Sequence, residues 1–82
     1  MHTQQSKGRT VAAVGSITAA IGARRALLDA RIPAEVVSLL PHETKKGCAY
    51  GVEFAVGDEA TARAALRAAR VGVSQYLRKE GN

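Results

Sequence analysis

The run from Cys48 to Val56 constrains the fold more than any other stretch, because apolar residues alternate with small or polar ones along it. One set holds Cys48, Tyr50, Val52, Phe54 and Val56, and the other holds Ala49, Gly51, Glu53 and Ala55. Successive side chains of a strand point to opposite faces of a sheet, so this period of two predicts a strand over 48–56. We expect the first set to face the core. The small residues of the second set would let another layer or subunit approach closely.

The N-terminal half predicts a strand followed by a helix. Residues 10–14 are short, apolar and β-branched at their ends, which is typical of a central strand. Residues 17–30 follow a helical period whose apolar face holds Ile17, Ala20, Ile21, Leu27 and Leu28. Either Ser16 or Thr18 can cap this helix, because a hydroxyl accepts an amide proton of the first turn. Pro33 disfavours the helical conformation in the residue before it, so the helix ends there.

Arg24 lies in the middle of the apolar face of this helix. Its stem can lie along the apolar side chains while the guanidinium reaches water. Alternatively, the guanidinium binds an anion at a subunit or ligand interface. The sequence leaves both interpretations open.

The C-terminal half predicts the remaining elements. Strands are expected at 35–40 and 71–77, and a helix at 59–70 with Asp58 as its N-cap. The buried stripe of that helix is Ala62, Ala65, Leu66 and Ala69, and its outer side carries Arg63, Arg67 and Arg70. These arginines could bind phosphates or form a solvated helix face. Residues 41–47 are expected to form a loop.

The expected order of elements is βαββαβ. With right-handed crossovers and both helices on one face, this order predicts an α+β, ferredoxin-like two-layer sandwich with an antiparallel four-stranded sheet. One domain would cover 10–78, with tails at 1–9 and 79–82. In this topology the first and third strands are central neighbours. The third strand therefore begins beside the end of the first strand, where the first helix starts.

Composition limits the function. One cysteine cannot form an internal disulfide or a structural zinc site. The net charge of +5 admits an acidic partner, but an aromatic content of 4% argues against nucleic-acid binding. No apolar run is long enough for a bilayer span and the start does not resemble a signal peptide, so we expect a soluble cytoplasmic protein. A chain of 82 residues buries a small core, which favours a homo-oligomer.

The predicted topology brings a thiol to the start of a helix. The expected site comprises Cys48, Lys45, Lys46, Gly47, Ser16, Ile17 and Thr18, with His42 as a proton relay. Free amides at a helix N-terminus and nearby cations stabilise a thiolate and can bind anions, so Cys48 would be nucleophilic near neutral pH. The competing interpretation is that Cys48 is a small buried hydrophobic residue. No cofactor motif or metal-ligand spacing accompanies it.

Several segments carry a resemblance to a known family: Gly15-Ser16-Ile17-Thr18-Ala19-Ala20, Ile32-Pro33, Leu40-Pro41, and Gly47-Cys48 followed by Tyr50-Gly51-Val52-Glu53-Phe54. Over residues 10–77 the chain resembles the selenium/sulfur carrier protein-like family, small bacterial proteins considered alongside the TusA and YedF sulfur carriers. The resemblance implies that Cys48 accepts sulfur or selenium as a persulfide or perselenide. A donor such as a cysteine desulfurase would load it, and an acceptor protein would unload it. The family usually has glycine after its cysteine, whereas this chain has Ala49.

The resemblance points to a carrier protein more than to a stand-alone enzyme. The alternative is a non-catalytic interaction or small-ligand-binding module that works through self-assembly, with Cys48 as a structural residue.

Overall fold

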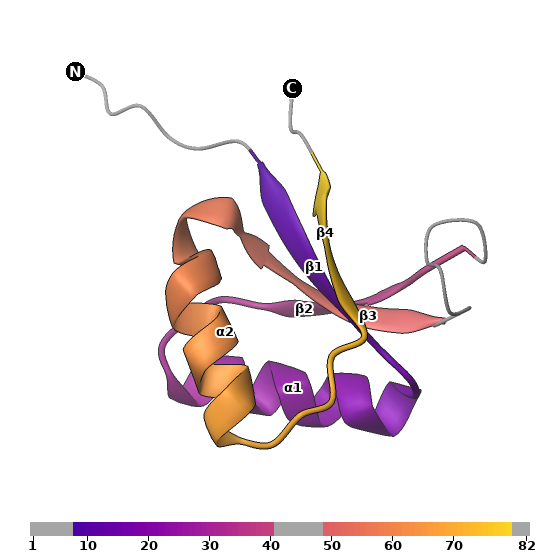
Figure 1. The fold of residues 1–82 in the computed structure, drawn as a ribbon, viewed down its shortest axis with the longest axis horizontal. Coiled ribbons are helices and arrows are strands. Elements are labelled where there is room, and N and C mark those ends of the chain that lie inside the picture. The colour runs from indigo at the N-terminus through magenta and orange to yellow at the C-terminus, as the bar shows by residue number, and fades with distance from the viewer. Residues whose placement is uncertain (1–7, 41–48, 80–82) are drawn as a thin grey trace.

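The computed structural model describes residues 8–40 and 49–79. Its elements are β1 (Arg9–Val14), α1 (Ile17–Asp29), β2 (Glu35–Ser38), β3 (Tyr50–Ala55), the 3-10 turn η2 (Val56–Asp58), α2 (Glu59–Ala68) and β4 (Gln75–Lys79). The four strands form one sheet in the order β2-β3-β1-β4, and every neighbouring pair is antiparallel. Both helices lie on one side of this sheet (Figure 1). The chain therefore has the predicted ferredoxin-like α+β fold.

Residues 50–55 of the alternating run form β3, which confirms a strand within the predicted range 48–56, whereas Val56 begins the 3-10 turn η2 and Cys48 lies outside the described residues. Val52 and Phe54 are fully buried and contact the helices in the main core. The buried members of that core are Ala12, Ala23, Leu27, Ile32, Ala34, Val52, Phe54, Ala62 and Leu66. Val14 at the end of β1 pairs with Tyr50 at the start of β3, which confirms the predicted meeting of these two strand ends.

A second, smaller cluster covers the sheet face away from the helices. It consists of buried Val11, Ala13 and Leu39, with the partly buried Val37 and Leu77 beside them. Gly51 lies under this cluster: a Cβ there would be 2.7 Å from Val11 Cγ1 and 2.9 Å from the Ala12 carbonyl oxygen. Side chains of the same chain therefore occupy the space over Gly51 that the small residues of this face leave open.

Helix α1 begins as predicted but buries only part of the predicted face. Ser16 is the N-cap, because its Oγ accepts a 3.0 Å hydrogen bond from the Ala19 amide. The buried residues of α1 are Ala20, Ala23 and Leu27. Three larger members of the expected apolar face are instead exposed: Ile17 at 43%, Ile21 at 59% and Leu28 at 43%. Ala20 and Leu27 are buried as expected, but the assignment of these three larger residues to the core was wrong. The helix is rotated so that alanines pack inward against the sheet and α2.

Arg24 is half-buried at the flank of α1. Its Nε donates a 2.9 Å hydrogen bond to the carbonyl oxygen of Ala34, the residue directly before β2. The side chain therefore ties α1 to the start of an edge strand, a role that neither sequence interpretation included.

Both helices end in the same way. Arg31 and Arg70 adopt left-handed φ angles of 66° and 59°. The next residue in each case donates back to the last turn: Ile32 to the Leu27 carbonyl at 2.9 Å and Val71 to the Leu66 carbonyl at 3.0 Å. These are Schellman motifs in which arginine takes the position that glycine usually occupies.

Asp58 holds the N-cap position of α2 as predicted, but its side chain makes no capping bond. It belongs to the 3-10 turn before α2, in which the Glu59 amide bonds the Val56 carbonyl. The predicted end of α2 and the predicted bounds of the last strand were wrong. The helix ends at Ala68, and β4 spans Gln75–Lys79 in place of the expected 71–77. Residues 71–74 run outside the ladder after the Schellman turn, and the Ser74 amide bonds the Ala13 carbonyl at 2.9 Å.

The first and last strands lie side by side, with Arg9 paired to Lys79 (Figure 1). Both residues belong to strands, so the folded part extends one residue beyond each end of the predicted domain, 10–78. Neither helix in the described ranges is long and apolar enough to cross a membrane.

Candidate functional site

The predicted thiol site is described only in part. Ser16, Ile17 and Thr18 are seen at the start of α1, where all three are exposed. The other predicted members, namely His42, Lys45, Lys46, Gly47 and Cys48, lie outside the described residues. The geometry that bears on this site is therefore that of its helix and of the two strand ends beside it.

The first turn of α1 carries amides with different partners. The Ala19 amide bonds Ser16 Oγ and the Ala20 amide bonds the Ser16 carbonyl, both at 3.0 Å. The amides of Ile17 and Thr18 precede the first intrahelical bond, and nothing among the described residues accepts from them. They lie just past Val14, which pairs with Tyr50. The positive end of the α1 dipole thus lies at the sheet end where β3 begins, with two amides that have no acceptor among residues 8–40 and 49–79.

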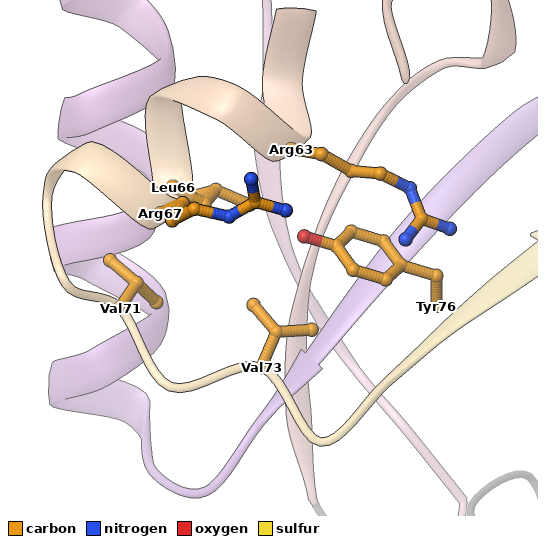
Figure 2. A pocket seen from close by; sticks show the side chains of 6 residues that line it. All are labelled: Arg63, Leu66, Arg67, Val71, Val73 and Tyr76. Carbon is orange, nitrogen blue, oxygen red and sulfur yellow. The ribbon is translucent and has the colours of Figure 1, made fainter. Parts of the chain in front are cut away.

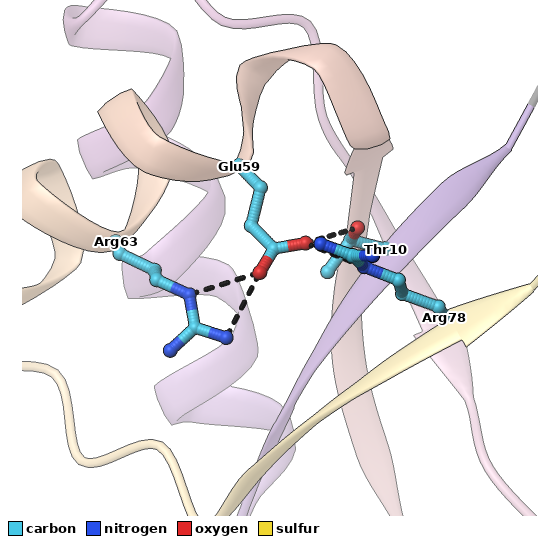
Figure 3. Close-up of polar contacts among 4 residues, drawn as sticks. All are labelled: Thr10, Glu59, Arg63 and Arg78. Atoms are coloured by element: carbon cyan, nitrogen blue, oxygen red, sulfur yellow. Dashed lines mark hydrogen bonds and ion pairs between the residues drawn. The ribbon is translucent and has the colours of Figure 1, made fainter. Parts of the chain in front are cut away.

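A cluster of polar side chains that was not predicted from the sequence surrounds Glu59 on the first turn of α2 (Figure 3). Glu59 Oε1 accepts from Thr10 Oγ1 at 3.0 Å and from Arg78 Nε at 3.1 Å. Its Oε2 accepts from Nε and Nη2 of Arg63 at 3.0 and 2.9 Å. Thr10 is completely buried. One carboxylate therefore joins α2 to β1 and β4.

These contacts shift the ionisation of Glu59. Its pKa lies below the ordinary value of 4.5, chiefly because Arg63 donates to the carboxylate. Arg78 and Thr10 act in the same direction, and partial burial opposes them. Glu59 is therefore fully ionised at neutral pH.

Arg63 also lies over the ring of Tyr76, with its guanidinium carbon 3.9 Å from the ring centroid. This is a cation–π contact. Burial raises the pKa of the Tyr76 hydroxyl, and the charges of Arg63 and Arg67 partly offset that effect. The hydroxyl is consequently protonated at neutral pH and can donate a hydrogen bond.

A pocket of about 220 Å³ opens beside this tyrosine (Figure 2). Its lining residues are Arg63, Leu66, Arg67, Val71, Val73 and Tyr76. They come from the second half of α2, from the segment after its Schellman turn, and from β4. The pocket therefore combines two guanidinium groups and a phenol with an apolar floor.

The position of Arg63 over the Tyr76 ring was not predicted from the sequence. Glu59 and Arg63 are four residues apart, a spacing that is compatible with an ion pair on a helix. Tyr76 was expected in the last strand, but the sequence does not show which residues lie next to it. Its position beneath Arg63 follows from the pairing of β4 with β1, in which Tyr76 lies opposite Ala12.

Within the ranges 8–40 and 49–79, no group of three or more His, Cys, Asp or Glu side chains is arranged to hold a metal ion. Comparisons with protein-family models and with curated proteins find no match for this chain.

Proposed function

We propose that this protein is a sulfur or selenium carrier that holds a persulfide or perselenide on Cys48 and passes it to a partner. The observation that supports the proposal is the pairing of Val14 with Tyr50, two residues after Cys48 in the chain, beside the N-terminus of α1. The amides of Ile17 and Thr18 would stabilise a sulfur anion there, together with Lys45 and Lys46.

The transfer needs no net oxidation. The Cys48 thiolate attacks the terminal sulfur of a donor persulfide, such as that of a cysteine desulfurase. The sulfur–sulfur bond of the donor breaks and the donor thiolate leaves. An acceptor nucleophile then takes the terminal sulfur, and the Cys48 thiolate is restored. Gly47 would shape the backbone next to Cys48, and His42 would relay the proton of the Cys48 thiol.

Incubation with a cysteine desulfurase and cysteine tests the carrier directly. We expect a mass gain of one sulfur atom in the protein and none in Cys48→Ser. The free thiol should be alkylated near pH 7 faster than the thiol of free cysteine, and the double substitution Lys45→Gln, Lys46→Gln should slow that reaction. The absence of any adduct, together with a thiol that reacts only after unfolding, would contradict the proposal.

A second candidate function is an interaction module that works by self-association. It is favoured by the exposed α1 stripe, which we define as Ile17, Ile21 and Leu28. Three large apolar side chains on one helix flank form a surface suited to a protein partner. Arg24 binds Ala34 from the same flank, so the stripe lies next to the edge strand β2.

Charge and strand geometry point to a second copy of this chain as the occupant. Arg25 and Asp29 lie one turn apart beside the stripe, and neither makes an ion pair within the described part of the chain. The Leu39 amide bonds the carbonyl of Ala49, the residue directly before β3, so by alternation the amides of Val36 and Ser38 face outward along the same edge.

Sedimentation at several concentrations tests this candidate. Ile21→Lys should weaken dimer formation at least about tenfold, because it places a charge in the apolar contact. Ala64→Lys, on the exposed side of α2, is the matched control and should leave the dimer unchanged. A wild-type chain that stays monomeric up to about 1 mM would exclude the candidate.

A further inference from the structure

The pocket between α2 and β4 does not involve the thiol site or the α1 stripe. Leu66 forms its floor and is 1% exposed. Val71 and Val73 form its apolar wall and pack against the main core. Arg67 and Tyr76 supply polar groups across from them, and Figure 2 shows the Tyr76 hydroxyl pointing toward the Arg67 guanidinium. Polar groups thus converge at one side of a small, open hollow that exposes more polar than apolar surface, with Leu66, Val71 and Val73 as its apolar part.

The two arginines of the pocket are not equivalent. Arg63 is held by both of its bonds to Glu59 and by the ring of Tyr76. Arg67, one turn later, has no hydrogen-bond or ion-pair partner among the described residues. The carboxylate next to these residues, that of Glu59, is already bound by Arg63 and Arg78. The pocket therefore has an excess of positive charge, centred on Arg67.

The Tyr76 hydroxyl adds a directed donor. It has no hydrogen-bond partner within the described chain, while its ring is fixed between the core and Arg63. A neutral phenol next to an unpaired guanidinium suits an acceptor that carries negative charge and has two oxygen atoms.

The apolar wall is preformed. The Schellman turn holds Val71 through its amide bond to Leu66, and the Ser74 amide bonds Ala13 in β1. The segment that carries Val71 and Val73 is therefore fixed at both ends, so a ligand does not have to order it.

We propose that this pocket binds a small carboxylate with a short hydrocarbon chain. The carboxylate lies between the Arg67 guanidinium and the Tyr76 hydroxyl, and the hydrocarbon chain lies on Leu66, Val71 and Val73. The volume of about 220 Å³ is below the range of about 300–1,000 Å³ that accommodates drug-sized ligands, so the ligand is small. Inorganic phosphate fits less well, because it would leave the apolar floor uncovered.

Titration of the full chain with hexanoate, followed by amide and methyl NMR shifts, tests the proposal. We expect saturable shifts confined to the neighbourhood of Val71, Val73 and Tyr76, with a dissociation constant in the millimolar range for so small a ligand. Phosphate and hexanol are the comparison probes. Each lacks one half of the interaction, and each should bind at least about tenfold more weakly.

Two variants test the polar groups. Arg67→Gln should weaken hexanoate binding about tenfold, and Tyr76→Phe, which keeps the ring that packs on the core, should weaken it about threefold. Arg70→Gln is the matched control: it removes the same charge near the end of α2 from a residue that does not line the pocket, and should bind as the wild type does. Unchanged melting temperatures would verify that the variants are folded.

Three results would overturn the proposal. One is equal loss of affinity in Arg67→Gln and Arg70→Gln, which would indicate general charge attraction. Another is phosphate binding at the same residues as tightly as hexanoate. The third is the absence of localised shifts at hexanoate concentrations far above the millimolar range.

Discussion

At the scale of single residues, Glu59 is the side chain with the most connections between elements. It bonds Thr10 of β1, Arg63 of its own helix and Arg78 of β4. The two arginines are largely exposed, with 47% and 68% of their side chains accessible, so solvent screens those ion pairs. The bond from the buried Thr10 hydroxyl is protected from such screening, and its loss would leave a buried donor unpaired.

Glu59→Gln should therefore change the acid dependence of stability. The pKa of Glu59 is below 4.5 in the folded state, so the unfolded chain takes up the proton first as the pH falls. The stability that the carboxylate contributes is complete above the unfolded pKa and is lost as the pH falls through the folded pKa. Because Gln keeps an oxygen that can accept from Thr10 and only the screened ion pairs are lost, we expect the variant to be about 0.5–1 kcal/mol less stable at neutral pH and to lose less stability than the wild type on acidification.

Urea unfolding between about pH 6 and pH 3 measures this difference. Glu35→Gln is the control, since Glu35 is exposed on β2 and makes no ion pair among the described residues. Parallel pH profiles for the wild type and Glu59→Gln would mean that the carboxylate contributes nothing to the acid dependence.

At the scale of elements, the two helices share a termination that places arginine in a left-handed conformation. The Schellman bonds at both ends are formed, but a residue with a Cβ is strained at φ angles of 66° and 59°. Glycine adopts these angles without that strain, although it loses more chain entropy on folding. The balance favours glycine at both positions.

Arg31→Gly should accordingly stabilise the protein by about 0.5–1 kcal/mol, and Arg70→Gly by a similar amount. Arg25→Gly should have the opposite effect on stability, because it places glycine inside α1 and should destabilise the protein by about 1 kcal/mol. Chemical denaturation of the three variants measures both effects. Destabilisation by Arg31→Gly would show that its side chain contributes more than its backbone strain removes.

The element boundaries show where sequence reasoning works. A hydroxyl cap and the start of α1 were predictable, because a hydroxyl at the beginning of a helical period is a local signal, but the choice of Ser16 over Thr18 was not. The rotation of α1 was not, because periodicity assigns large side chains such as Ile21 to the core and cannot weigh the close packing that Ala20 and Ala23 allow. The start of β4 was placed too early, because the apolar character of Val71 and Val73 does not distinguish a ladder from an extended segment that merely covers the core.

At the scale of the whole molecule, the topology and the central pairing of β1 with β3 were predictable from the order of elements and the alternation in β3. The pocket beside Tyr76 was not, because it depends on the register of β4 with β1, which joins residues far apart in the sequence.

The sheet also separates two apolar clusters of unequal size, one beneath the helices and one over Gly51.

Gly51→Ala tests the smaller cluster. The added methyl group would lie 2.7 Å from Val11 Cγ1, 2.9 Å from the Ala12 carbonyl oxygen and 3.3 Å from Leu39 Cδ1. The carbonyl belongs to the central strand and cannot easily move, so we expect destabilisation of about 1–3 kcal/mol. Gly57→Ala meets no atom within 4 Å and should change stability by less than about 1 kcal/mol. Equal thermal stability of the two variants would contradict this packing.

The pairing of Arg9 with Lys79 has a consequence for engineering. Adjacent strands are about 5 Å apart, so Arg9 of the interior strand β1 and Lys79 of the edge strand β4 lie at neighbouring points at one end of the sheet. A domain with this geometry can be spliced into a surface loop of a host protein without forcing the loop ends apart. Circular permutants joined across these two strands by a short linker should likewise keep the sheet order.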